Sequence, residues 1–211
     1  LLNLKNDFKI YGDNLKIISL DLMRKNFDKE LISNLKKLKI YPDFLINNAR
    51  SISNLKIDKT GIISDEAMIN EFKLGVVVPY KIVMNLVNMK EKRLKRVINI
   101  ASIYGVVAPN LMLYKDYKTE SPIHYGLAKA SLIQLTKELA VRLSNKEVLV
   151  NCIAYGGLEG RSDLEFKSRY SKLCPAGRML KEKEISKPLE ILLSEGTEGI
   201  NGHVLMVDGG W

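Results

Sequence analysis

The chain has 211 residues, of which 46% are hydrophobic, and this is enough for one core of ordinary size. Two cysteines, Cys152 and Cys174, are too few for a disulfide framework or a cysteine-based zinc site, so we expect no metal and reduced thiols. The net charge is +9, but the Lys and Arg residues alternate with carboxylates along stretches of helical period. We therefore expect solvated helix faces in a cytoplasmic protein, with no nucleic-acid or membrane partner.

The order of predicted elements is typical of β-α-β units. Short runs rich in Ile and Val predict strands at residues 17–20, 44–46, 97–100, 148–153 and 203–207. Stretches of helical period predict helices at residues 25–38, 65–89, 122–143 and 183–193. This alternation indicates an α/β fold, a single domain over residues 1–211, in which helices cover both faces of a mostly parallel sheet.

Polar or glycine residues follow four of the predicted strands: Asp21, Asn48, Ser102 and Gly156. The carboxyl ends of parallel strands meet at one edge of the sheet, where open α/β sheets bind their ligands. The sequence therefore predicts a ligand site at this edge.

Tyr125 and Lys129 are four residues apart in the predicted helix 122–143, so their side chains share one face. A phenol has a pKa near ~10, and an adjacent ammonium favours the phenolate, which would let Tyr125 act as an acid or base. The Ser102 hydroxyl would hold a carbonyl or alcohol oxygen beside it. An isolated Tyr-x-x-x-Lys pair is more often a solvated helix face, so the neighbouring motifs decide the interpretation.

Several ordered motifs together resemble the short-chain dehydrogenase/reductase family. They are Asp21-Leu22, Asn47-Asn48-Ala49, Ser102, Tyr125 with Lys129, Asn151, Gly156-Gly157 and Val207-Asp208-Gly209-Gly210. The resemblance implies a Rossmann-like three-layer αβα fold and hydride transfer between NAD or NADP and a hydroxyl or carbonyl group. In it, Tyr125 moves the proton, Lys129 lowers the pKa of the phenol and holds the ribose, and Ser102 orients the reacting oxygen.

The same resemblance implies a set of cofactor-binding residues: Asp21, Leu22, Asn48, Ala49, Tyr125, Lys129, Gly156 and Leu158. For Asp21, a helix-capping role is an equally good interpretation. The chain departs from the family pattern at three positions. Arg50 replaces a glycine and would narrow the cleft or reach a phosphate, Gly75 or Val76 stands where the family carries an asparagine, and Gly160 replaces a hydroxyl residue.

The family's glycine-rich phosphate loop has no counterpart, because Gly12 is the only glycine before Gly61. We expect an N-terminally truncated fold that lacks the first strand and this loop, either as a fragment or as a shortened product. Without those backbone amides a dinucleotide would lose its main anchor.

The segment from Ser102 to Pro109, with Gly156 to Arg161, resembles a subgroup from bacterial surface-polysaccharide and flagellar-sugar biosynthesis. This implies a polar small-molecule substrate, such as a sugar or sugar phosphate, with Lys118, Arg161 or Arg169 as candidate cations. The alternative is a truncated, non-catalytic remnant that acts in subunit assembly, since helices 65–89 and 122–143 resemble the family's subunit contact. A homodimer or homotetramer is expected in either case. Substrate identity, NAD against NADP and reaction direction stay open.

Overall fold

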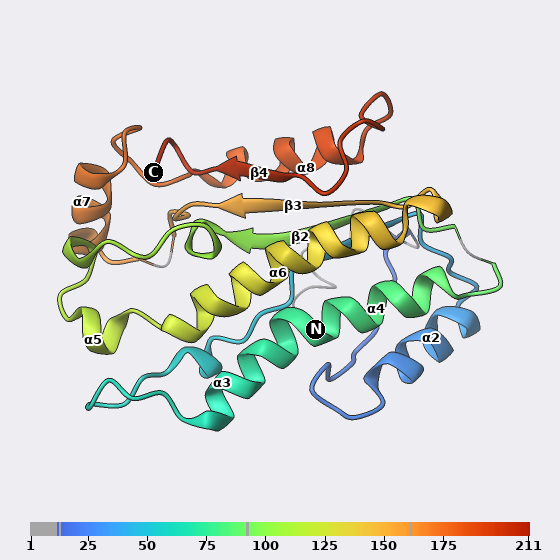
Figure 1. The fold of residues 1–211 in the computed structure, drawn as a ribbon, viewed down its shortest axis with the longest axis horizontal. Coiled ribbons are helices and arrows are strands. Elements are labelled where there is room, and N and C mark those ends of the chain that lie inside the picture. The colour runs from blue at the N-terminus through green and yellow to red at the C-terminus, as the bar shows by residue number, and fades with distance from the viewer. Residues whose placement is uncertain (1–11, 13, 92, 161) are drawn as a thin grey trace.

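A computed structural model describes residue 12 and residues 14–91, 93–160 and 162–211. Its sheet contains four parallel strands in the order β1 (Phe44–Asn47), β2 (Arg96–Ser102), β3 (Leu149–Tyr155) and β4 (Val204–Val207). In the pairing register, Asn47 lies beside Asn99, and Ser102 lies beside Tyr155. Four predicted strands are thus confirmed to within two residues at either end, and their carboxyl ends share one edge (Figure 1).

Seven helices surround this sheet in the described part of the chain (Figure 1). They are α2 (Phe27–Lys37), α3 (Asp65–Phe72), α4 (Val78–Val87), α5 (Tyr117–Glu120), α6 (Ile123–Arg142), α7 (Leu164–Leu173) and α8 (Ser186–Leu193). None of the helices in these residues combines the length and the apolar character needed to cross a bilayer.

The alternation of side chains along β2 and β3 places helices on both faces of the sheet. Val97 and Val150 point into a core shared with α2, α4 and α6. Ile98 and Ile153, which lie one and three residues further along their strands, point to the opposite face and pack on Leu192 of α8. Because consecutive residues of a strand face opposite sides, both faces of the central strands are apolar, which confirms the predicted α/β layers.

The predicted helix 65–89 is interrupted by one π turn at Lys73–Val77. Ser64 caps its beginning, since its hydroxyl accepts a hydrogen bond from Ala67 N at 3.2 Å. Pro79 follows the π turn and cannot donate the next backbone hydrogen bond, which accounts for the local widening. The turn carries Gly75 to the surface of α6, where a Cβ would lie 3.4 Å from that of Ala128.

One predicted strand is absent, and the short helix α5 and the helix α7 were not predicted. Residues 17–20 form no strand, because β1 pairs only with β2 in the described sheet and a strand needs a hydrogen-bonded neighbour. Ile18 and Leu20 instead pack on the core beside α2 and α4. Helix α7 was not predicted; its start is capped by Asp163, which accepts from Phe166 N at 2.7 Å.

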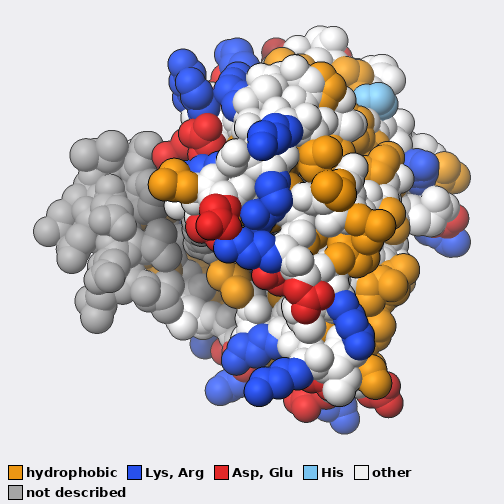
Figure 2. All heavy atoms as spheres, turned by 90° about the vertical axis from the view of Figure 1, so that its left-hand side faces the viewer, with side chains coloured by type: hydrophobic (Ala, Val, Ile, Leu, Met, Phe, Trp, Pro, Cys, Tyr) orange, Lys and Arg blue, Asp and Glu red, His pale blue; other side chains and the backbone are white. Residues whose placement is uncertain are grey.

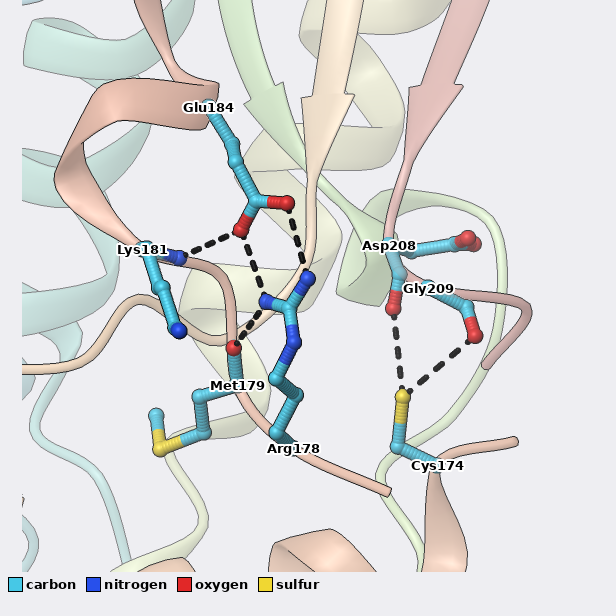
Figure 3. Close-up of polar contacts among 7 residues, drawn as sticks. All are labelled: Cys174, Arg178, Met179, Lys181, Glu184, Asp208 and Gly209. Carbon is cyan, nitrogen blue, oxygen red and sulfur yellow. Dashed lines mark hydrogen bonds and ion pairs between the residues drawn. The ribbon is translucent and has the colours of Figure 1, made fainter. Parts of the chain in front are cut away.

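The turn Asp208-Gly209-Gly210 is fixed by the segment that follows α7 (Figure 3). The Cys174 thiol donates to the carbonyl oxygens of Asp208 and Gly209, at 3.4 and 3.6 Å. Arg178 forms a two-pronged ion pair with Glu184 at 2.7 and 2.8 Å, and Lys181 N donates to the same carboxylate. These contacts place the polypeptide after α7 against the carboxyl end of β4, beside the edge where the ligand site is expected.

Gly209 is the position in this turn that tolerates substitution least. Its φ is +75°, and a Cβ would lie 2.9 Å from that of Ala176. We expect Gly209→Ala to lower the free energy of unfolding by about 1–3 kcal/mol, through strain and steric conflict together. Gly199→Ala is the matched control, because nothing lies within 4 Å of its Cβ position. Urea denaturation of both variants measures the difference, and equal losses would contradict the prediction.

Candidate active site

Most of the predicted residues lie around one cleft of ≈ 1150 Å³ at the carboxyl ends of the strands. Six of the candidate residues line it: Asn48, Ser102, Tyr125, Lys129, Gly156 and Leu158. Figure 2 looks onto the end of the molecule at which the strand arrows of Figure 1 terminate, and it shows apolar side chains gathered toward the right-hand side. Of the four residues expected at strand ends, Asn48, Ser102 and Gly156 line this cleft and Asp21 does not.

Ser102, Tyr125 and Lys129 come from two neighbouring elements. Ser102 ends β2 and is buried; its hydroxyl accepts a hydrogen bond from Tyr104 N at 3.2 Å. Tyr125 and Lys129 lie one turn apart on α6, with Lys129 Nζ 5.7 Å from the centroid of the Tyr125 ring. The ammonium donates to the carbonyl oxygen of Ile100 at 2.7 Å. An ammonium has three donors, so two remain for a ligand.

The electrostatics of Tyr125 differ from the expectation. Burial raises the pKa of Tyr125, while the hydrogen bond with Ser102 and the positive charge of Arg50 lower it. Burial also lowers the pKa of Lys129, and the negative charge of Glu71 opposes this. The predicted depression of the phenol pKa by Lys129 was therefore wrong in its net direction, because loss of solvation outweighs the nearby positive charge.

Arg50 lies closer to the candidate catalytic residues than the sequence indicated. Its guanidinium carbon is 5.7 Å from the centroid of the Tyr125 ring, and the side chain lines the cleft. This is the position at which the chain replaces the family's glycine. The substitution thus adds a positive charge beside the phenol.

Glu71 is a residue of the site that the sequence analysis missed. Its side chain is 4% exposed, and its Oε2 is buried without a hydrogen-bond partner among the described residues. Burial raises the pKa of Glu71, whereas the positive charges of Lys129, His124 and Arg50 and a hydrogen bond with Asn54 lower it. The sequence feature that could have identified Glu71 is a carboxylate on the inward face of the helix that precedes Pro79.

His124 lies in the same region and is fully buried. Its Nε2 is 2.6 Å from the carbonyl oxygen of Asn54, and its Nδ1 has no hydrogen-bond partner in the described part of the chain. The ring fixes the loop after β1 against the first turn of α6 and does not line the cleft.

The remaining candidate cofactor residues are divided between two places. Leu22 and Ala49 line a second cavity of ≈ 160 Å³, which shares Asn48 and Lys129 with the cleft. Asp21 lines neither; its exposed carboxylate accepts from Met23 N at 2.9 Å and lies 3.9 Å from Arg24. In this structure Asp21 therefore caps a local turn.

Packing within the protein explains the two glycines after β3. A Cβ on Gly156 would lie 2.9 Å from Asp208 Cα, and one on Gly157 would lie 2.6 Å from Tyr170 Cε2. The Gly157 N–H donates to the Tyr170 hydroxyl at 2.9 Å. These close contacts let α7 and the C-terminal turn form one wall of the cleft.

The segment between Ser102 and Tyr125 packs against α7 and extends this wall. Tyr114 packs edge-on against Tyr117 and Phe166, and its hydroxyl donates to that of Tyr104 at 3.2 Å. Arg169 anchors this wall, because its Nε donates to the carbonyl oxygen of Leu113 at 2.7 Å.

The three positively charged side chains expected to bind the substrate differ in their surroundings. Arg169 is occupied by this anchoring contact and by Glu165 at 3.8 Å. Lys118 packs against Gly61 and does not line the cleft, and Arg161 lies outside the described residues.

The residues present fit the nicotinamide end of a dinucleotide. Lys129 has donors left for ribose hydroxyls, Asn48 stands at the end of β1, and the cleft beside Tyr125 is large enough for a ring and a substrate together. The pyrophosphate end has no glycine-rich turn in this sequence before Gly61. The residues of the cleft therefore fit the nicotinamide end of the cofactor, where hydride is exchanged, and not its pyrophosphate.

Comparison with known proteins assigns the family. A family model described as enoyl-(acyl carrier protein) reductase matches residues 8–211. The chain belongs to the short-chain dehydrogenase/reductase family. Members of this family are NAD(P)-dependent oxidoreductases.

Two curated relatives illustrate the similarity. Post-translational flagellin modification protein A of Campylobacter coli is 34% identical over 122 residues, which are 58% of this chain and 48% of the relative. The aligned part thus spans about half the length of that relative. The 3-oxoacyl-[acyl-carrier-protein] reductase FabG of Aquifex aeolicus is 26% identical over 215 residues, covering 98% of this chain and 78% of the relative.

Solved family structures carry the expected cofactors. A short-chain dehydrogenase of Leptospira borgpetersenii with bound NAD+ is 26% identical, with a TM-score of 0.81 over 92% of this chain and 74% of that one. The RhlG/NADP complex of Pseudomonas aeruginosa is 25% identical, with a TM-score of 0.83 over 99% of this chain and 80% of that one. The cofactor class of the family, NAD or NADP, is therefore the one expected from the motifs.

The buried carboxyl of Glu71 makes stability depend on pH in a predictable direction. Because the pKa of Glu71 is raised in the folded chain, the folded state loses stability as the pH rises above the ordinary value of 4.5. Glu71→Gln removes this loss. We expect the free energy of unfolding of the variant, minus that of the unmodified chain, to rise by on the order of 1 kcal/mol from pH 4 to pH 7.

Urea denaturation at the two pH values measures this difference. Glu66→Gln is the control, because Glu66 lies on the same helix and is exposed. A Glu71→Gln variant with the same pH dependence as the unmodified chain would show that the carboxyl carries no such penalty.

Proposed function

We propose that this protein transfers hydride between NAD(P) and a hydroxyl or carbonyl group of a polar substrate, such as a sugar or sugar phosphate. The observation that carries the proposal is the convergence of Ser102, Tyr125 and Lys129 on one cleft. Each has a chemical role there that its surroundings support.

Tyr125 supplies the proton. Because burial raises the pKa of Tyr125, the phenol is protonated at neutral pH and can donate to a carbonyl oxygen as the carbonyl is reduced. The Ser102 hydroxyl orients that oxygen, since it is fixed by its bond to Tyr104 N. NAD(P) supplies or accepts the hydride. Lys129, held on the carbonyl of Ile100, directs its remaining donors toward the ribose.

A sugar substrate is supported by one relative and by the wall of the cleft. The Campylobacter coli relative is a flagellin modification protein, which fits a role in surface-polysaccharide or flagellar-sugar biosynthesis. The cleft wall presents the rings and hydroxyls of Tyr104, Tyr114 and Tyr117, groups that can stack on a sugar and hydrogen-bond to it. The free, buried Cys152 and Cys174 suit the reducing cytoplasm.

The proposal includes a homodimer or homotetramer. Exposed apolar side chains gather on α6 and on the helices beside it: Ile69, Val77, Tyr80, Ile123 and Leu127. Figure 2 shows apolar side chains along the right-hand side, toward which the front helices of Figure 1 are turned. A contiguous apolar surface of this kind is typical of a subunit interface.

Substitution of Tyr125 tests the chemistry. Tyr125→Phe retains the ring and removes the hydroxyl, so we expect a fall in kcat of at least ~100-fold with an unchanged far-ultraviolet circular dichroism spectrum. Turnover is followed by NAD(P)H absorbance with a panel of sugars and short alcohols. Tyr117→Phe is the control for loss of a phenol from the cleft wall. Full activity of Tyr125→Phe would remove Tyr125 from the mechanism.

A charge on the apolar helix surface tests the assembly. Leu127→Glu, on the exposed face of α6, is expected to reduce the mass measured by sedimentation equilibrium from a dimer or tetramer toward a monomer. Leu164→Glu is the control, because this leucine is more exposed but lies on α7. A monomeric unmodified protein, or an unchanged mass for Leu127→Glu, would contradict this interface.

A further inference from the structure

Arg50 carries a positive charge in the cleft and forms no ion pair with the described residues. Arg50 and Lys129 are the positively charged side chains in the described cleft lining. The Lys129 ammonium is buried and bound to Ile100 O. The Arg50 guanidinium forms no ion pair or hydrogen bond with the described residues, and its recorded contact is with the face of the Tyr125 ring.

The surroundings of Arg50 favour an anion as its partner. The lining nearest in sequence is apolar, at Ile46, Ile52 and Leu55. The Arg50 side chain is exposed to solvent, and the five N–H donors of its guanidinium form a planar fork that matches a carboxylate or a phosphate. The buried carboxylate of Glu71 interacts with Arg50 electrostatically but forms no ion pair with it, and neither does Glu159, the carboxylate in the cleft lining.

We propose that Arg50 binds a carboxylate or phosphate group of the substrate and thereby selects acidic sugars or sugar phosphates over neutral ones. This rests on the proposed function, since it assigns the substrate class of the same cleft. The guanidinium lies 5.7 Å from the centroid of the phenol ring, and charged hydrogen bonds are about 2.8 Å long. An anion bound there lies a few bonds from the carbon whose oxygen meets Tyr125.

Binding of anions in the absence of cofactor and turnover provides the first test. The probes are D-glucuronate, D-glucose 6-phosphate and neutral D-glucose, titrated into ¹⁵N-labelled protein while the arginine Nε–Hε signals are recorded. We expect one arginine signal, missing in Arg50→Gln, to shift with the two anions and not with glucose. Arg50→Gln should weaken anion binding at least tenfold, and Arg50→Lys should weaken it less.

Arg142→Gln is the matched control, because Arg142 pairs with Glu138 at the far end of α6. Unchanged anion binding in Arg50→Gln, or an equal loss in Arg142→Gln, would overturn the proposal. Circular dichroism establishes that each variant is folded, and Arg50→Lys serves if Arg50→Gln is not.

The cofactor also carries phosphate groups that Arg50 could bind. Calorimetric titration with NAD and NADP distinguishes binding of the cofactor from binding of the substrate. If Arg50→Gln weakens cofactor binding and leaves binding of glucuronate and glucose 6-phosphate intact, Arg50 binds the cofactor and the proposal is wrong. Failure of the proposed function has a different signature: Tyr125→Phe would then remain active while the Arg50 signal still responds to the anions.

Discussion

The site depends on the close approach of α6 to the turn that follows β2. This turn, Ile103–Gly105, lies so near the helix that a Cβ on Gly105 would be 2.8 Å from the backbone carbon of Lys129. A Cβ on Gly126 would likewise lie 3.0 Å from the carbonyl oxygen of Tyr104. With glycine at both positions, the serine at the end of the strand and the phenol on the helix reach one cleft. A larger residue at either position would force the two elements apart and separate the reacting groups.

This approach also determines the charges at the site. Because Lys129 is enclosed between α6 and β2, its ammonium loses water and gains the carbonyl of Ile100 in return. Glu71 supplies a negative charge from α3 that opposes the fall in the pKa of Lys129 and adds to the rise in that of Tyr125. The buried carboxylate therefore favours the charged lysine and the protonated phenol together. This is the pair of protonation states that reduction of a carbonyl requires.

Local patterns were enough to predict most of the sheet and to place Tyr125 and Lys129 on one face of a helix. Buried parallel strands are nearly continuous apolar runs, so β2 and β3 could be located from sequence, and i,i+4 spacing placed Tyr125 and Lys129 on one face. Residues 17–20 form a similar apolar run but have no strand partner in the described sheet. Strand pairing depends on distant segments, so the local pattern could not show this. Helix α7 is polar, and Tyr170 is its one fully buried residue, so its periodicity did not reveal it.

The features that sequence reasoning missed depend on contacts between distant segments. Glu71 comes near Lys129 because α3 packs on α6, and no pattern within either helix specifies that distance. Arg50 was recognised as a departure from the family, but its position over the ring of Tyr125 follows from the path of the loop after β1. The net direction of the Tyr125 pKa was wrong for a related reason, because burial is a property of the assembled cleft.

Arg50 connects substrate recognition with the proton donor. With no anion bound, its positive charge lowers the pKa of Tyr125 and so favours release of the proton. An anionic group bound by the guanidinium would neutralise much of that influence, and the pKa of the phenol would rise further. An acidic substrate would then raise the pKa of Tyr125 as it binds, whereas a neutral substrate of the same shape would not. Arg50, which stands where the family carries a glycine, thereby makes the pKa of the phenol depend on what occupies the cleft.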